Sequence, residues 1–271
     1  MFQFVIVIPI YKNFYDLTIG EKKSLYRSLD VFVNEDIVLL VSDSVSISGY
    51  KSSLKNKIIY KSISKSHFNN TDTYSKLLTS SYFYSLFDHY KWMLICQLDA
   101  YVFKNDLHSY VDRNDFFFIG APVVNANIKD WDNQTWVGNG GFSLRRVEEF
   151  VKVSQKLEYL KMKLNIFPSF LLMGNSFISA IFRLTLEKIY KVKFNKYLLR
   201  YFNGYKVNED IFWCLWVPSF IINFKISDIN TASRFSFEVS PNEMYNSILK
   251  MPMGCHAWEK YDPDYWAKYI P

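Results

Sequence analysis

FVIVIPIY, residues 4–11, is an almost unbroken run of apolar, largely β-branched residues near the start of the chain. A strand that is apolar at nearly every position is covered on both faces, as in the parallel sheet of an α/β protein. Three further runs are expected to form strands of the same sheet: DIVLLVSD (36–43), KIIYKSI (57–63) and WMLICQLDAYVF (92–103). Segments with helical spacing separate them, SLYRSLDVF (24–32) and TYSKLLTSSYFYSLF (73–87), the second with Thr71 or Asp72 as its N-cap. This alternation predicts a mostly parallel central sheet flanked by helices.

The composition predicts one folded domain spanning residues 1–271, because 49% of the chain is hydrophobic and 19% is aromatic. The net charge of +6 is compatible with anionic ligands and identifies none of them. Cys96, Cys214 and Cys255 are widely spaced and form no CxxC pair. This spacing favours a reducing, cytoplasmic compartment over a disulfide or structural zinc framework.

Residues at the carboxyl ends of the predicted strands are the first candidates for a ligand site, because ligands of open α/β sheets bind at that edge. Pro9, Tyr11, Asp43 and Asp99 occupy such positions. The sequence has no GxGxxG after its first strand, no GxxxxGK[ST], no HExxH and no GxSxG. Dinucleotide-binding, P-loop, zinc-peptidase and serine-hydrolase sites therefore lack local support.

A glycine-rich stretch, VGNGGFSLRR (137–146), is the most unusual segment of the second half. Gly138, Gly140 and Gly141 around Asn139 permit positive φ and let the backbone approach a ligand closely. An ordinary tight turn is the alternative. Three of the chain's nine glycines within four residues favour a contact loop.

Two further motifs each allow two interpretations. In NEDIFW (208–213), Glu209 and Asp210 are either first-turn residues of a helix capped by Asn208, or they include a carboxylate base whose pKa is raised by burial. His256 in GCHAW (254–258) is either a packed structural residue or a ligand. The second interpretation of His256 requires an oxygen ligand from another strand end.

Residues 164–182 carry no charge but contain Pro168, Gly174 and three serines, so we expect a buried or acceptor-side helix pair and no membrane span. Six basic residues follow among aromatic ones: Arg183, Lys188, Lys191, Lys193, Lys196 and Arg200. They favour, as an alternative, a peripheral contact of residues 164–205 with the inner face of a cell membrane, as for an enzyme with a lipid-linked acceptor. A nucleic-acid-binding module at residues 188–205 is a further alternative, and we do not expect nucleic acid as a partner.

Together these motifs resemble those of GT-A-fold nucleotide-sugar glycosyltransferases, and more narrowly those of a bacterial family of such enzymes. The resemblance lies in QxDA (97–100), GAP (120–122), GNGGFSLR (138–145), ED (209–210), FSxE (235–238) and HAW (256–258), in that order. The order is specific, whereas ED or HAW alone would be weak. The resemblance implies a GT-A-like, Rossmann-like α/β sheet with a less regular acceptor-side C-terminal half. Residues 1–103 would bind the nucleotide, and residues 104–271 the donor sugar and the acceptor.

The resemblance also implies a set of nucleotide-sugar-binding residues. These are Pro9, Tyr11, Asp43, Lys76, Gln97, Asp99, Tyr101, Asn139, Gly140 and Gly141. Pro9, Tyr11 and Asp43 would hold the base and the ribose, and Lys76 would face the diphosphate.

A metal site is implied at the position of the usual Asp-x-Asp motif. Here that position holds Asp99, Ala100 and Tyr101, so Tyr101 stands where a second acid is expected. Asp99 and His256 would then hold a divalent ion, Mn²⁺ or Mg²⁺, against the diphosphate. In a metal-free variant, cations such as Lys76 or Arg145 would offset that charge.

The implied function is transfer of a hexose from a nucleotide-diphosphate sugar, with UDP as the nucleotide, to a saccharide acceptor in bacterial surface polysaccharide synthesis. Galactose, as pyranose or furanose, is the expected sugar. Inversion would use Asp210 as the catalytic base on the acceptor hydroxyl, with Glu209 binding a hydroxyl. A retaining transferase of the same fold and a non-catalytic saccharide-binding protein are the alternatives.

Overall fold

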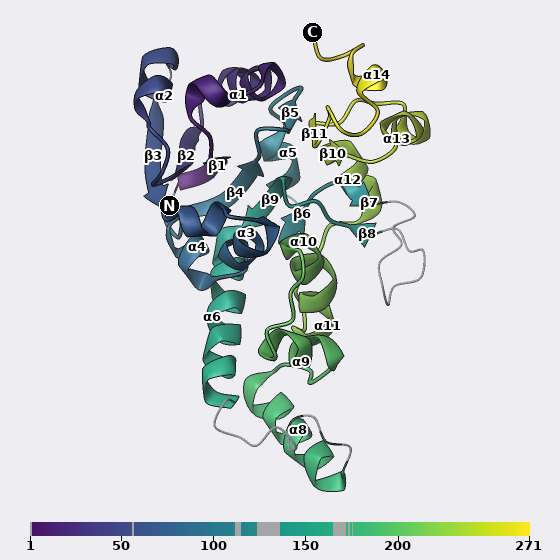
Figure 1. The fold of residues 1–271 in the computed structure, drawn as a ribbon. Coiled ribbons are helices and arrows are strands. Elements are labelled where there is room, and N and C mark those ends of the chain that lie inside the picture. The colour runs from purple at the N-terminus through teal and green to yellow at the C-terminus, as the bar shows by residue number, and fades with distance from the viewer. Residues whose placement is uncertain are drawn as a thin grey trace.

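The computed structural model describes residues 2–55, 57–111, 115–123, 136–164, 172, 174 and 176–271 (Figure 1). The first part of the chain forms β1 (Phe2–Ile10), η1 (Phe14–Asp16), α1 (Ile19–Val31), β2 (Asp36–Ser42), α2 (Ser48–Ser53), β3 (Ile58–Ile63), η2 (Lys65–Phe68), α3 (Thr71–Leu78), α4 (Ser81–Ser85), β4 (Tyr90–Cys96), β5 (Tyr101–Val102) and α5 (Leu107–Val111). The second part forms β6 (Phe118–Ile119), β7 (Pro122–Val123), β8 (Trp136–Val137), β9 (Phe142–Arg146), α6 (Val147–Leu164), α8 (Phe177–Tyr190), α9 (Lys196–Phe202), α10 (Glu209–Ile211), η3 (Phe212–Trp216, a π-helical turn), α11 (Val217–Phe220), α12 (Ile229–Phe235), β10 (Ser236–Phe237), α13 (Pro241–Ile248), β11 (Gly254–Cys255) and α14 (Pro263–Trp266).

A six-stranded sheet with the order β3-β2-β1-β4-β9-β6 forms the centre of the molecule. The first four strands are parallel, whereas β9 runs antiparallel to both β4 and β6. The predicted mostly parallel α/β sheet is therefore confirmed. Because β9 comes from the second half of the chain, that half contributes strands to the same sheet.

The apolar runs form strands because both faces of the central strands are covered. Val5, Ile6 and Val7 in β1 are fully buried, and so are the side chains of β4 from Trp92 to Ile95. Figure 1 shows α1 and α2 above the sheet in this view, with α3, α4 and α6 below it. Burial of these strands from both sides supplies the hydrophobic driving force for the sheet.

Two predicted elements are shorter than expected. The helix predicted at residues 73–87 is divided into α3 and α4, and Asn70, not Thr71 or Asp72, caps α3 by accepting the N–H of Thr73. The strand predicted at residues 92–103 ends at Cys96 and resumes as β5 in a different sheet. At both places, local hydrogen bonds of side chains or of a backbone turn compete with the regular hydrogen bonds of the helix or the strand.

The rest of the second half is less regular, as predicted. A three-stranded sheet, β10-β11-β5, and a two-stranded sheet, β7-β8, flank the main sheet. Helix α8 lies at the far end of the projection formed with α6 and α9 (Figure 1). Much of the helix pair expected at residues 164–182 lies outside the described residues. Within the described part of the chain, none of the helices has the length and apolarity needed to cross a membrane.

Candidate functional site

The carboxyl end of β4 is where the chain leaves the main sheet. The N–H of Gln97 donates to the carbonyl oxygen of Gly141 at 2.8 Å, and a turn follows in which the N–H of Ala100 donates to the carbonyl oxygen of Gln97 at 2.9 Å. Strand β5 then pairs antiparallel with β11, with Tyr101 opposite Cys255. This pairing brings Asp99, in the turn, beside His256, the residue that follows β11.

His256 lies among three oxygen atoms from distant parts of the chain. Its Nε2 is 3.2 Å from Oδ1 of Asp99 and 3.2 Å from Oε1 of Gln97, and its Nδ1 is 2.9 Å from Oε1 of Glu238. Burial acts to lower the pKa of His256, but the two carboxylates outweigh burial and raise the pKa to about 10. Burial likewise acts to raise the pKa of Asp99, and the hydrogen bond and charge of His256 bring that pKa below its usual value. The two acids therefore favour a positive charge on the imidazole between them.

The same atoms suit a divalent cation. Carboxylate, imidazole and amide oxygen are ligands that Mn²⁺ and Mg²⁺ accept, and substrate phosphates commonly complete the coordination of such ions. Glu238 contacts Nδ1 and orients the imidazole, as a carboxylate that hydrogen-bonds a ligating histidine does in many metal sites. Among the described residues, no three His, Cys, Asp or Glu side chains are placed to bind a metal by themselves. The residues that would hold the ion are thus Asp99 and His256, with Gln97 beside them.

The glycine-rich loop packs against functional side chains at two positions. A Cβ on Gly140 would lie 1.4 Å from Oε1 of Glu209, and a Cβ on Gly141 would lie 2.1 Å from Nε2 of His256. The left-handed residue of the loop is Asn139, with φ of 64°, so the expectation of positive φ at the loop's glycines was wrong. Asn139 tolerates this conformation because its side-chain oxygen accepts the N–H of Gly141 at 2.9 Å.

Glu209 forms a buried ion pair with Arg145. The guanidinium of Arg145 is fully buried, and one of its nitrogens is 3.0 Å from Oε1 of Glu209. Arg145 also donates to the hydroxyl oxygens of Tyr84 at 2.8 Å and Ser143 at 3.0 Å. Burial acts to lower the pKa of Arg145, but the charge of Glu209 and the contact with Tyr84 raise it, so Arg145 stays cationic. The buried Oε2 of Glu209 has no hydrogen-bond partner among the described residues. Glu209 lines a pocket of about 150 Å³.

Asp210 is half-buried and lines the same pocket as Glu209. Its Oδ2 accepts the backbone N–H of Asn139 at 3.3 Å, and its Oδ1 accepts the N–H of Ile211 at 2.8 Å. Burial raises the pKa of Asp210 above its usual value. Burial has this effect on a carboxylate base and on a first-turn helix residue alike, so the role of Asp210 as a base stays a prediction. Asn208 is the N-cap of α10, as predicted, although its side chain makes no capping hydrogen bond.

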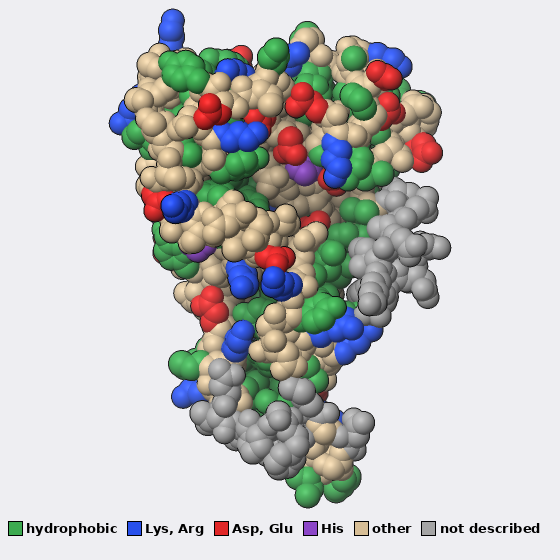
Figure 2. All heavy atoms as spheres, in the orientation of Figure 1, with side chains coloured by type: hydrophobic (Ala, Val, Ile, Leu, Met, Phe, Trp, Pro, Cys, Tyr) green, Lys and Arg blue, Asp and Glu red, His purple; other side chains and the backbone are tan. Residues whose placement is uncertain are grey.

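A second, larger pocket adjoins this one. It has a volume of about 370 Å³ and is lined by Pro9, Tyr11, Phe68, Asn70, Thr71, Tyr74 and Gln97. The rings of Tyr11 and Phe68 have centroids 6.1 Å apart, and those of Phe68 and Tyr74 are stacked at 5.9 Å. We call it the aromatic pocket. We call the smaller space of about 150 Å³, lined by Glu209, Asp210 and His256, the acid pocket. The two pockets share Thr71, Tyr74 and Gln97, and Figure 2 shows a hollow on this face with a histidine and acidic side chains at its edge.

Most residues singled out from the sequence converge on these two pockets. Pro9 and Tyr11 line the aromatic pocket, and Asn139, Gly140, Gly141, Glu209, Asp210 and His256 line the acid pocket. Gln97 lines both pockets, and Asp99 contacts His256.

Three predicted residues line neither of these two pockets. Asp43 is exposed and accepts the N–H of Lys65 at 2.8 Å. Tyr101 is buried in a second hydrophobic cluster, where its ring lies 5.3 Å from Phe103 and 6.3 Å from Trp258. Lys76 lines a third pocket, on another face of α3.

Sequence reasoning missed four residues of the site: Phe68, Tyr74, Arg145 as the partner of Glu209, and Glu238 as the partner of His256. Arg145 and Glu238 belong to the quoted GNGGFSLR and FSxE segments, which was the available signal. No sequence signal marked Phe68 and Tyr74, because aromatic residues are frequent throughout this chain.

The sheet order, the strand-end turn of Asp99 and the small sheet that brings in His256 make this a GT-A fold. Two structures of LgtC share it. That of the galactosyltransferase LgtC with donor and acceptor sugar analogues aligns with a TM-score of 0.50 and 10% identity, and that of an active-site mutant of LgtC with 0.50 and 11%. Each alignment covers 93% of this chain and 86% of LgtC. A glycosyltransferase involved in glycosylation of the major capsid of PBCV-1 aligns with a TM-score of 0.44 and 12% identity over 94% of this chain and 92% of its own.

Residues 57–256 match the family described as "Protein of unknown function (DUF5672)", and the chain belongs to this family. No curated protein matches the sequence. The matched segment contains the Asp99 turn, the glycine-rich loop, both acids and His256, and leaves β1 outside.

Proposed function

We propose that this protein is a glycosyltransferase that moves a hexose from a nucleotide-diphosphate sugar to a saccharide hydroxyl. One observation carries the proposal: the aromatic pocket, the Asp99–His256 pair and the acid pocket form a continuous site at the carboxyl edge of the sheet. Planar rings at Tyr11, Phe68 and Tyr74 suit a nucleobase, since aromatic faces stack on bases. A diphosphate beyond the base would then lie near Gln97 and Asp99.

Asp210 is the proposed catalytic base. Glycosyl transfer by inversion requires a carboxylate that removes the proton from the acceptor hydroxyl as the sugar is transferred. Burial raises the pKa of both acids, so their hydrogen-bond partners distinguish them. Asp210 accepts two backbone N–H groups, whereas Glu209 is paired with Arg145 and its Oε2 has no partner among the described residues. We therefore assign proton removal to Asp210 and the binding of a sugar hydroxyl to Oε2 of Glu209.

Asp99 and His256 are the proposed ligands of a divalent ion. When bound, such an ion supplies positive charge against the leaving diphosphate. Asp99 and Glu238 contact the imidazole of His256 from both sides, and Glu238 on Nδ1 would orient the ring for an ion. Lys76 and Arg145 are less suited to offset the diphosphate charge, since Arg145 is fully buried against Glu209 and Lys76 lines a different pocket.

UDP as the nucleotide, galactose as the sugar and a bacterial surface polysaccharide as the acceptor are finer proposals that rest on the motif resemblance. A thermal-shift panel of UDP-, GDP- and dTDP-sugars with and without Mn²⁺ tests them, since a ligand at 100 times its Kd stabilises the protein by ~2.7 kcal/mol. We expect a UDP-hexose to give the largest shift, and the shift to increase with Mn²⁺. If no nucleotide sugar stabilises the protein, the proposal is wrong.

A retaining transferase is the alternative mechanism on the same fold. The anomeric configuration of the product, read by NMR from a transfer reaction, separates the two mechanisms. An inverted product is expected if Asp210 acts as the base. A retained product would remove Asp210 from that role.

A peripheral membrane contact is a further part of this proposal. Helix α8 exposes Phe177, Ile178 and Leu184, with relative exposures of 80, 68 and 57%, and basic residues lie on and just after it. Apolar and basic side chains together suit an anionic bilayer surface, on which a lipid-linked acceptor would be presented. Co-sedimentation with vesicles that contain phosphatidylglycerol, compared with neutral vesicles, tests the contact. Equal recovery with both kinds of vesicle would contradict it.

A further inference from the structure

A third pocket lies on the other side of α3 from the aromatic pocket. It has a volume of about 130 Å³ and is lined by Asp72, Ser75, Lys76, Thr79, Lys161, Tyr201, Gly204, Tyr205, Lys206, Val207 and Phe212. The residues of α3 explain the separation. Positions 72, 75, 76 and 79 share one helical face, whereas Thr71 and Tyr74 line the aromatic and acid pockets. We call this third space the lysine pocket.

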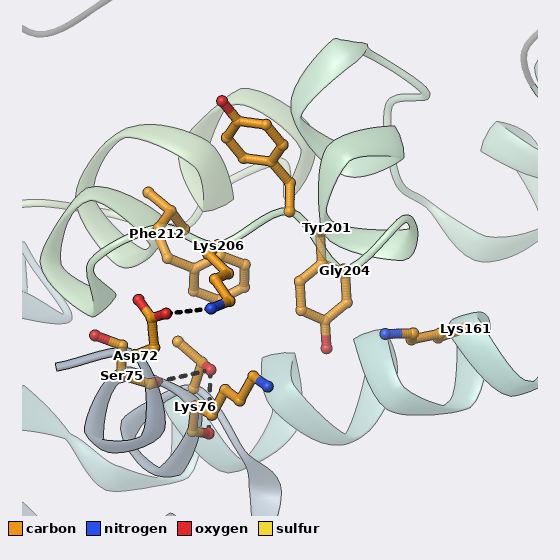
Figure 3. Close-up of a pocket in the computed structure, with 11 residues that line it drawn as sticks. Asp72, Ser75, Lys76, Lys161, Tyr201, Gly204, Lys206 and Phe212 are labelled. Carbon is orange, nitrogen blue, oxygen red and sulfur yellow. Dashed lines mark hydrogen bonds and ion pairs between the residues drawn. The ribbon is translucent and has the colours of Figure 1, made fainter. Parts of the chain in front are cut away.

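The lysine pocket carries a surplus of positive charge. Figure 3 shows the amino groups of Lys76, Lys161 and Lys206 on its wall, brought there by α3, α6 and the segment after α9. Among the described residues that line it, Asp72 is the one acid, and it is paired with Lys206 at 2.5 Å. Among the described residues, no carboxylate lies within ion-pair distance of Lys76 or Lys161. The lining residues therefore sum to a net charge of +2, three lysines against one aspartate.

The remaining lining groups suit a sugar. Tyr201 and Tyr205 present aromatic rings, and aromatic rings pack against the apolar faces of saccharides. Lys161 lies 5.5 Å from the centre of the Tyr201 ring. Burial raises the pKa of the Tyr201 hydroxyl to about 12, so this group remains a hydrogen-bond donor. The pocket combines cations, hydroxyl donors and rings.

The lysine pocket also continues from the acid pocket. Ser75 lines both spaces, and Phe212 lines the lysine pocket two residues after Asp210. An acceptor whose hydroxyl reaches Asp210 would extend along α10 toward Lys76 and Lys161. The nucleotide, in contrast, would lie across α3 in the aromatic pocket.

We propose that the lysine pocket binds an anionic group, a phosphate or a carboxylate, on the saccharide acceptor. This inference rests on the proposed function, because it takes the acid pocket as the place of transfer. It assigns Lys76 and Lys161 to recognition of the acceptor and gives the acceptor a chemical class, a negatively charged saccharide.

Calorimetric titration of the UDP-saturated protein with glucose 6-phosphate, glucuronate and glucose tests the inference. The two charged sugars should bind ~10-fold or more tightly than glucose, because hydrogen bonds to charged groups exceed neutral ones. The stronger of the two charged arms identifies phosphate or carboxylate. Equal affinity for all three sugars would overturn the inference.

The variant K76Q/K161Q should lose most of this preference. The matched control is K163Q/K188Q, which removes the same charge from two exposed lysines outside the pocket. An equal loss in the control would mean that overall charge, not the pocket, attracts the anion.

UDP titrated alone into K76Q/K161Q should bind as it binds the wild type. A loss of UDP affinity would assign the lysines to the donor diphosphate and overturn the inference. Failure of the proposed function would look different, since UDP would then not bind the wild type at all.

Discussion

Arg145 and Glu209 should be strongly coupled in stability because both are buried, and a double-mutant cycle measures the coupling energy. Arg145 is fully buried, and Glu209 is 8% exposed. Removing one partner of such a pair leaves an uncompensated buried charge, which destabilises by about 3–5 kcal/mol. In the variant Glu209→Leu, Arg145 keeps its hydrogen bonds to Tyr84 and Ser143, and Oε2 of Glu209, which has no partner among the described residues, is removed. We therefore expect this variant to lose a free energy of unfolding at the lower end of that range.

Arg145→Met should lose about as much, since it leaves the Glu209 carboxylate buried without its cation. The double variant should lose much less than the sum, because apolar groups of similar volume can replace a buried ion pair with little loss. Urea unfolding followed by circular dichroism gives the free energies, provided that the slope of the free energy against urea is unchanged.

The control is the exposed pair of Lys152 and Glu148, at 2.6 Å with both side chains 57% exposed. Its coupling energy should be about 0.3–0.5 kcal/mol, as for other i,i+4 pairs. A coupling energy at Arg145 and Glu209 as small as that of the exposed pair would refute the reasoning.

Four further predictions concern the site. Asp210→Asn should lower kcat by ~10²–10⁴-fold while nucleotide-sugar binding in a thermal-shift assay persists. Burial raises the folded-state pKa of Asp210, so ionisation of this carboxyl opposes folding as the pH rises through that pKa. In urea unfolding, Asp210→Asn should therefore be more stable than the wild type at pH 7 and should lose this advantage at lower pH. An advantage that grows toward low pH would contradict this prediction. Gly141→Ala places a Cβ 2.1 Å from Nε2 of His256, which should displace the imidazole ring. Mn²⁺ binding, measured by titration, should weaken ~10–100-fold. Unchanged Mn²⁺ binding would exclude His256 as a metal ligand. Tyr101→Phe should leave donor affinity intact, since the ring packs away from the pocket; a loss as large as that of Asp99→Asn would return Tyr101 to the binding site.

The strands of the main sheet could be predicted because their information is local. Continuous apolar runs such as residues 4–11 specify burial on both faces, and the sheet followed from their alternation with helices. The break after Cys96 could not be predicted in this way. In an unbroken strand Asp99 and Tyr101 would share one face, but the turn that joins Ala100 to Gln97 separates them, and Tyr101 points into the second hydrophobic cluster.

The pairing within the site depends on contacts between residues far apart in the chain. Arg145 and Glu209 are 64 positions apart, and no local pattern connects them. Lys76 shows the same limit within a single helix, because helical spacing indicates which residues share a face but not which pocket that face borders. The ordered motifs brought most site residues together only because they were considered as a set.

The pairing of β5 with β11 has a consequence for the order in which the protein is made. The turn that holds Asp99 is synthesised before β11 and His256, since Gln97 at the start of that turn precedes His256 by 159 positions. Until they arrive, β5 has no partner strand on that edge, and Asp99 has no imidazole beside it. A nascent chain therefore contains every residue that lines the aromatic pocket before it contains the imidazole that pairs with Asp99.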